Sequence, residues 1–416
     1  EEMYNNSVKK PLVIILILCL IILTLLGVRY RIPFRWLKSK SLPPVSGLTF
    51  QAQVEHSIEK GLQWLYSKQS PDGGWRSETY GLTKSGQSMT PFTLYAMTQI
   101  TNPKSRYPID KGIKFLLDQI NPDGSVGTRG IQDYPTYSTA LSVIVLSRLR
   151  ANNWQEQVKP MVRYLKNQQL VDELGWNTAD PEYGGWGNGG WITKPSEPMP
   201  EIFKQLVVDR VDLSHTVFVL EALNSAGLAR DDESLKKALV FVEKCQNYPD
   251  VHRGDGGFIF APNSILGNKA GPSGKDEKGM EYYRSYGSMT ADGVRALLFC
   301  WLDAEHQRIQ AGIKWLMDNF RADQCPGFTN DPQPPWSQGV VFYYYWSFSR
   351  LLDDKILPSS RHSIAKEIAA KLIQLQAGDG SWKNPIALMK EDDPLISTNL
   401  AMMTLDYCRR CLNNED

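Results

Sequence analysis

Two aspartates stand where an acidic side chain could do proton chemistry. Asp212 in "DLSHT" and Asp292 in "YGSMTADG" each lie at the start of a long apolar stretch. A carboxyl group in such a place can act as a general acid when burial and neighbouring groups keep its proton on. An aspartate at a helix start can instead cap the helix by accepting backbone N–H bonds. With that alternative open, Asp212 and Asp292 are the candidate catalytic residues.

The stretch before Asp292 holds more polar groups than the start of a buried helix requires. Tyr286, Ser288 and Thr290 occur at alternate positions there. We expect these three side chains to bind the substrate of a site that contains Asp292.

An aromatic run, "FYYYW" at residues 342–346, supplies further candidates. Five consecutive residues cover every direction around a helix, so some of these rings must face inward. The π face of such a ring attracts a cation, although rings also simply fill space. Tyr344 and Trp346 are the two substrate-binding candidates in this run.

The elements that carry these residues come from an internal repeat. "QSPDGGW" at 69–75 and "QAGDGSW" at 376–382 place Gln, Asp, Gly and Trp at the same offsets. Weaker copies between them give six units, with Val126, Trp186, Phe258 and Phe328 at the position of the tryptophan. A sequence that repeats at such intervals indicates a fold built from repeated structural units.

Each turn joins two kinds of predicted helix. The stretch before it has one apolar stripe, and the stretch after it is apolar nearly all round, so the first is an outer helix and the second a buried one. The pattern predicts an all-α fold over residues 50–416, a closed α/α toroid of six outer plus six inner helices. We expect the glutamine to bond free carbonyls at the end of the outer helix, and the aromatic ring to cover the neighbouring repeat.

The repeated Gln…Gly-x-Trp turns resemble those of the terpenoid cyclase and protein prenyltransferase superfamily, which includes the squalene–hopene cyclases. "VDLSHTVFVLEAL" and "YRSYGSMTADGVRALL" look most like bacterial proteins with prenyltransferase/squalene-oxidase repeats. The resemblance covers residues 50–416. It implies a central cavity with the reactive groups at the N-terminal ends of the inner helices.

The chain departs from the cyclase acid motif. Class II cyclases carry Asp-x-Asp-Asp-Thr, whose middle aspartate is the acid that starts cyclisation. Asp212 and Thr216 match that motif, but Ser214 and His215 replace its two decisive aspartates. Asp212 and Ser214 can instead cap a helix.

The prenyltransferase zinc site is also incomplete. Its Asp-x-Cys would begin at Asp292, but Val294 stands in place of the cysteine, and the next inner stretch, "VVFYYYWSF", has no histidine. We therefore expect no metal and no cofactor. The acidic residues at 391–393 precede the sixth inner helix, where they suit the helix dipole.

The charge balance and the hydropathy of the chain indicate whether it binds nucleic acid and whether it is anchored in a membrane. The 46 basic and 45 acidic side chains give no basic surplus of the kind that nucleic-acid binders carry. Residues 11–28 are an uncharged apolar run long enough to cross a bilayer. We expect residues 1–40 to be a single-pass transmembrane anchor and 41–49 a linker. Basic residues after the span favour a cytoplasmic toroid slightly, and the opposite side remains open.

Two functions remain. In the first, the protein is a membrane-anchored, non-catalytic interaction or assembly subunit of a membrane complex, with a lipid held in its cavity. In the alternative, it is an isoprenoid-processing enzyme, squalene/terpene cyclase-like, that protonates or binds a polyprenyl substrate drawn from the bilayer. The missing acid and zinc ligands favour the first, whereas an open, apolar cavity would favour the enzyme. The expected partners are the lipid bilayer, an isoprenoid or lipid ligand and membrane-protein subunits, but no nucleic acid.

Deleting residues 1–40 should yield a soluble, folded helical protein, because the predicted repeats close on themselves without the anchor. Size-exclusion chromatography and circular dichroism of the truncated chain test this expectation. Aggregation of that chain through an exposed apolar face would contradict it.

Overall fold

The computed structural model describes most of the chain beyond the predicted anchor. The described residues are 47–100, 106–128, 130, 132–150, 153–190, 192–195, 211–249, 254–264, 267–275, 277, 279, 281–332, 334–353 and 356–413. The chain divides into two compact units, Glu1–Ser41 and Leu42–Asp416. The predicted span, 11–28, lies outside the described residues. Within them, no helix has the length and apolar composition needed to cross a membrane.

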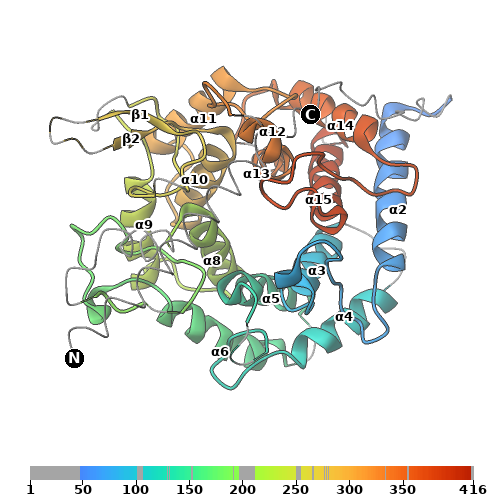
Figure 1. Cartoon of the computed structure of the whole chain (residues 1–416), viewed down its shortest axis with the longest axis horizontal. Helices are drawn as coiled ribbons and strands as arrows, with labels where there is room; N and C mark the ends of the chain where they lie inside the picture. Colours follow the sequence, from blue (N-terminus) through green and yellow to red (C-terminus); the bar gives the residue numbers. More distant parts are fainter. Residues whose placement is uncertain are drawn as a thin grey trace, which may run out of the picture. The chain divides into compact units, whose positions relative to one another are not determined.

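Six helices of the second unit form an inner ring in the part of the chain that is described (Figure 1). They are α3 (Met89–Gln99), α5 (Pro135–Leu149), α8 (Leu213–Ser225), α10 (Gly287–Phe299), α13 (Val341–Asp353) and α15 (Pro394–Asn413). Each packs against the next, and α15 returns to α3. The predicted α/α toroid is confirmed.

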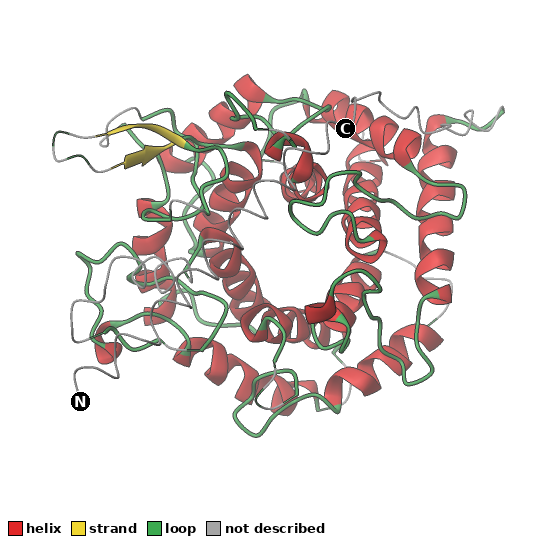
Figure 2. Cartoon of the chain, in the orientation of Figure 1, coloured by secondary structure: helices red, strands yellow, loops and turns green. Residues whose placement is uncertain are grey.

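An outer layer of helices surrounds this ring (Figure 2). It consists of α2 (Phe50–Ser67), α4 (Tyr107–Leu117), α6 (Trp154–Asn167), α9 (Glu233–Lys244), α11 (Gln307–Asn319) and α14 (Arg361–Leu375). Helix α2, the first described helix, packs against α15 and α14, which are the last. The two ends of the repeat array therefore meet.

Burial separates the two layers as the sequence pattern predicts. In α6 only Val158, Met161 and Leu165 are buried, at spacings of three and four residues. In α5 every residue from Ser138 to Ser147 is buried. The outer helices thus bury one stripe and the inner helices bury every face.

Shorter elements that the sequence did not predict lie in the connections. They are two 3₁₀ turns, η1 (Gly81–Thr83) and η2 (Asp172–Leu174), the short helix α12 (Trp336–Gly339) and an antiparallel pair of strands, β1 (Pro272–Lys275) and β2 (Glu281–Tyr283). Lys275 lies opposite Glu281 in this pair.

A hydrogen bond repeated around the toroid fixes each turn to its inner helix. The backbone N–H at the tryptophan position donates to a threonine hydroxyl in the first turn or two of the inner helix, over 3.0 to 3.2 Å. The acceptors are Thr90, Thr139, Thr216, Thr290 and Thr398. The same bond, repeated five times, sets the depth at which five of the inner helices begin.

The glutamine of the turn links one repeat to the next. Gln69 donates to the carbonyl of Gly73 in its own turn and to that of Pro108 at the start of α4. Gln376 makes the corresponding bonds to Gly380 and, across the closure, to Ser57 of α2. The prediction that this glutamine bonds carbonyls at the end of the preceding outer helix is therefore wrong, because its side-chain amide bonds the next outer helix instead.

The indole of the turn tryptophan, and not the glutamine, bonds a carbonyl at the end of the preceding outer helix. Nε1 of Trp75 donates to the Leu65 carbonyl near the end of α2, and Nε1 of Trp382 donates to Leu372 of α14 in the same way. These bonds satisfy carbonyls that a helix end leaves free.

Gly380 shows why the turn needs glycine. Its φ is +96°, and a Cβ there would lie 2.5 Å from the Lys60 carbonyl oxygen of α2. Gly184 has the same conformation and a still closer approach, 1.9 Å, to Lys237 of α9. The turn backbone therefore packs directly on the next outer helix.

Gly380→Ala should destabilise the toroid by about 2 to 4 kcal/mol, since it combines a left-handed conformation with an overlap against backbone. The matched control is Gly378→Ala in the same loop, where a Cβ meets nothing within 4 Å. Denaturant unfolding of both variants measures the difference. Equal midpoints for the two would contradict the role given to the closure.

Candidate functional site

A cavity of about 450 Å³ lies among the N-terminal ends of the inner helices. Each of the six inner helices, or the residues just before it, contributes to the wall: Met89, Tyr137, Ser214, Tyr286, Tyr343 and Ile396 are examples. The lining is largely apolar. The volume of the cavity lies within the range of about 300 to 1,000 Å³ that small-molecule sites occupy.

Aromatic rings form one wall of this cavity. Phe218 of α8 stacks on Trp346 of α13 with ring centroids 5.4 Å apart. Tyr137 meets Phe218 edge-on at 5.1 Å, and Tyr343 lies 5.4 Å from Trp346. Rings from α5, α8 and α13 therefore make a continuous aromatic surface.

The predicted substrate-binding residues divide into two groups. Tyr286, Ser288 and Trp346 line the cavity. Thr290 is the acceptor of the turn bond from Phe258 and is fully buried. Tyr344 is also fully buried and is not among the lining residues, because the register of α13 turns its neighbour Tyr343 to the cavity instead.

Asp212 caps α8, as the alternative interpretation of this residue states. Its Oδ1 accepts the backbone N–H of His215 over 2.8 Å. Its Oδ2 lies 2.6 Å from Nδ1 of the same histidine. Asp212 and His215 therefore form a dyad, and His215 lines the cavity.

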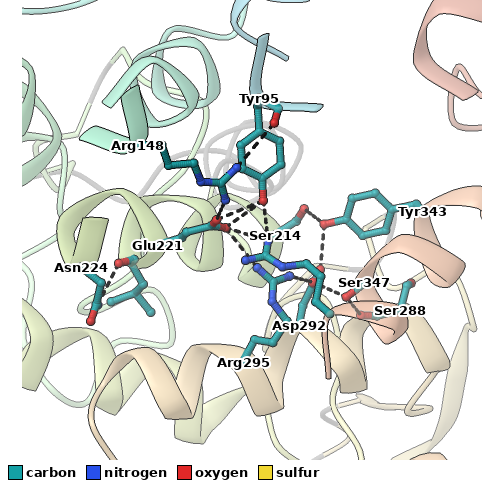
Figure 3. A network of polar contacts seen from close by, with 12 residues as sticks. Tyr95, Arg148, Ser214, Glu221, Asn224, Ser288, Asp292, Arg295, Tyr343 and Ser347 are labelled. Carbon is teal, nitrogen blue, oxygen red and sulfur yellow. Dashed lines mark hydrogen bonds and ion pairs between the residues drawn. The ribbon is translucent and has the colours of Figure 1, made fainter. Parts of the chain in front are cut away.

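Asp292 is joined to the cavity wall by a chain of hydroxyl groups (Figure 3). Tyr343 donates to its Oδ2 over 2.7 Å, and Ser214 lies 2.8 Å from the Tyr343 hydroxyl. Tyr137 in turn donates to Ser214 over 2.8 Å. The chain spans α10, α13, α8 and α5, and three of its members line the cavity.

Burial raises the pKa of Asp292. The carboxyl is fully buried, and bonds from Arg295, Ser347 and Tyr343 oppose the effect of burial without cancelling it. Removing the charged form from water favours the protonated carboxyl.

Glu391 does not act on the sixth inner helix, as was predicted for the acidic residues at 391–393. Its carboxylate accepts the backbone N–H groups of Phe342 and Tyr343 at the start of α13, which is the fifth inner helix and not the sixth. Asp393 is the residue that caps the sixth, by accepting from Leu395. Burial raises the pKa of Glu391 to about 7.

A buried charge cluster lies beside Asp292. Glu221 of α8 bonds Arg350 over 2.7 Å, Arg148 over 3.1 Å and Arg295 over 3.2 Å. Arg295 also bonds Asp292 over 3.0 Å and so joins the cluster to the hydroxyl chain. Figure 3 shows the two networks meeting at Arg295.

The cluster sets the charge of Glu221. Burial alone would raise the pKa of this carboxyl, but the guanidinium groups of Arg350, Arg295 and Arg148 lower it to about 2. Tyr95 adds a bond to Glu221 from α3. The carboxylate is therefore ionised and ties α8 to four other inner helices, α3, α5, α10 and α13.

Several of these residues were not predicted from the sequence. Glu221, Arg295 and Arg350 lie within mostly apolar helices, and a charge in such a place must find a buried partner. That pattern was available in the sequence. Nothing in the sequence shows that Tyr343 and Ser214 meet, because their bond joins different helices.

Metal ligands do not gather in the described part of the chain. No group of three or more His, Cys, Asp or Glu residues there could hold a metal ion.

Sequence comparison supports the fold over part of the chain. A family model described as the prenyltransferase alpha-alpha toroid domain matches residues 42–177. Comparison with curated protein sequences finds no match.

Solved structures extend the likeness to nearly the whole toroid. The type II terpene cyclase MstE from Scytonema, in complex with its substrate geranylgeranyl dihydroxybenzoate, is 11% identical, with a TM-score of 0.59 over 87% of this chain and 99% of that one. Its apo form is 13% identical, with a TM-score of 0.56 over 87% and 99%. An α-1,6-mannanase of Salegentibacter is 13% identical, with a TM-score of 0.54 over 88% and 100%. At these identities the likeness shows the fold alone.

Glu221→Gln should destabilise the protein by about 3 to 5 kcal/mol, because it leaves the buried guanidinium groups of Arg295 and Arg350 without the Glu221 carboxylate. Glu305→Gln, on an exposed residue, is the matched control and should have little effect. Thermal unfolding followed by circular dichroism compares the two. A Glu221→Gln protein as stable as the control would show that the cluster does not hold the ring together.

Proposed function

We propose that this protein is an isoprenoid-processing enzyme of the terpene cyclase kind, which binds a polyprenyl chain in its central cavity and protonates it. The observation that carries the proposal is the hydroxyl chain from Asp292 through Tyr343 to Ser214. In the cyclase motif the acid stands at the position of Ser214. Here the carboxyl lies on α10 instead, and its proton can reach the same position through two hydroxyl groups.

Proton delivery along this chain is balanced at every step. When Asp292 is protonated on Oδ2, the bond to Tyr343 reverses: the carboxyl donates to the Tyr343 oxygen, and the Tyr343 hydroxyl donates to Ser214. Asp292 then passes its proton to the Tyr343 oxygen, Tyr343 passes its own to Ser214, and Ser214 passes its own to a carbon of the substrate double bond. The double bond supplies the electron pair of the new C–H bond and leaves a carbocation. Arg295, 3.0 Å from Asp292, stabilises the carboxylate that remains.

The cavity wall suits such a substrate. Its apolar lining matches an isoprenoid chain and does not match a sugar polymer, which needs many polar partners. The rings of Phe218 and Tyr343 line the cavity, and the π face of such a ring attracts a cation. MstE, which has the same fold, binds a substrate with a geranylgeranyl group.

The second candidate is the non-catalytic, lipid-holding subunit of a membrane complex. The replacement of the two motif aspartates by Ser214 and His215 favours it. It predicts ligand binding in the same cavity without turnover.

We further propose that residues 11–28 anchor the toroid to a bilayer, from which an isoprenoid could enter the cavity. The uncharged apolar composition of this run supports the proposal.

Tyr343→Phe should lower turnover of polyprenyl substrates by about 100-fold or more, the usual scale for loss of general acid catalysis. The change keeps the ring and removes the hydroxyl that Asp292 and Ser214 share. Tyr345→Phe is the matched control on the same helix, since its hydroxyl bonds the Ala322 carbonyl. Product analysis by mass spectrometry measures both. Equal turnover in the two variants would contradict the chain, and no turnover by the unmodified protein would favour the second candidate.

The pH dependence tests which form of Asp292 acts. The protonated carboxyl is the donor, so turnover should be highest at low pH and fall as pH rises through the pKa of Asp292. Since burial raises that pKa, the fall should come above the ordinary value of 3.8. A pH–rate profile for kcat measures it. Turnover that increases with pH across this range would exclude Asp292 as the acid.

A further inference from the structure

His215 carries a polar atom that the proton-delivery chain does not use. The residue is 9% exposed, lines the cavity and lies against the Tyr137 ring with centroids 3.9 Å apart. Its Nε2 atom is buried and has no hydrogen-bond partner among the described residues. Buried polar atoms are nearly always paired, so an unpaired one on a cavity wall points to a ligand.

Asp212 determines what Nε2 can do. A carboxylate only accepts hydrogen bonds, so in the neutral form of His215 the proton lies on Nδ1, 2.6 Å from Oδ2. The other carboxylate oxygen is held by the backbone N–H of His215, which fixes the orientation of the Asp212 side chain. Nε2 is left with a lone pair, as an acceptor.

Three other atoms of the wall share this condition. Nε1 of Trp346 and the hydroxyl groups of Tyr286 and Ser88 are buried, lie on lining residues and have no partner in the part of the chain that is described. An apolar cavity with such atoms favours a ligand that is mostly hydrocarbon but carries a polar group.

We propose that the cavity binds an isoprenoid alcohol, whose hydroxyl group donates a hydrogen bond to Nε2 of His215. The inference rests on the proposed function, because it names the substrate class of the same cavity. A hydrocarbon isoprenoid has no donor and would leave Nε2 unpaired, which is unfavourable. Ser214 directly precedes His215, so the hydroxyl end of the ligand lies near the end of the proton chain. The double bonds next to that end are then the ones within reach of Ser214.

Three probes of equal chain length test the inference: geranylgeraniol, its methyl ether and the corresponding hydrocarbon. Each is titrated calorimetrically into the full-length protein. We expect the alcohol to bind about 10-fold more tightly than the other two, as one hydrogen bond provides. The methyl ether is the decisive comparison, because it keeps the oxygen and lacks only the donor.

The substitution Asp212→Asn should change Nε2 of His215 from a hydrogen-bond acceptor into a donor. The amide oxygen must stay where Oδ1 accepts the backbone N–H, so the amide nitrogen faces Nδ1 and donates to it. The imidazole proton then moves to Nε2, which becomes a donor, and the alcohol and the methyl ether can both accept from it. We expect the 10-fold preference to disappear. Asparagine caps a helix about as well as aspartate, so the fold should persist.

Asp232→Asn is the matched control, because Asp232 caps α9 by accepting from Ser234, away from the cavity. This variant should keep the preference for the alcohol. If the unmodified protein binds all three probes equally, or if Asp212→Asn keeps the full preference, the inference is overturned while the proposed function stands. If none of the three probes binds, the proposed function falls with it.

Discussion

The hydrogen bond between a turn and the threonine of its inner helix is the constraint on which the toroid depends. It recurs at Thr90, Thr139, Thr216, Thr290 and Thr398, so five of the six inner helices are held to their turns within their first five residues. The cavity lies where these helices begin. The positions one to four residues before or after each threonine are therefore the ones that reach the wall, as Ser214 and His215 do before Thr216. The hydrogen bond that holds each turn to its inner helix thereby determines which side chains can contact a ligand.

The buried charges connect this scaffold to the chemistry. Glu221 holds three guanidinium groups, and one of them, on Arg295, also holds Asp292. Three positive groups face two carboxyl groups in this cluster, so the carboxylate of Asp292 has a compensating charge beside it. Complete burial favours the protonated carboxyl, and Arg295 favours the ionised one. An acid that must release and regain a proton needs both influences.

The sequence predicted the layers well and the site only in part. Amphipathic and all-apolar stretches distinguish outer from inner helices because burial is a local property of the pattern. Tyr286, Ser288 and Trp346, which were chosen because they stand near an inner helix start or within the aromatic run, line the cavity. Thr290 and Tyr344 are not among the lining residues, and the turn bond and the register of α13 that place them elsewhere appear only in three dimensions. The hydroxyl chain from Asp292 could not be predicted, because its members come from four helices far apart in the chain.

The closure between Ser57 and Gln376 has a consequence for how the protein is made. These residues are 319 positions apart, yet they bond to one another in the finished ring. During synthesis α2 leaves the ribosome before the other described helices, and its partners α14 and α15 follow only when the last repeat has been translated. Its apolar stripe stays uncovered for that whole interval, when a chaperone or a neighbouring nascent chain could bind it. Completion of the cavity therefore depends on synthesis of the last repeat, and a chain that stops before it would have an open edge instead of a binding site.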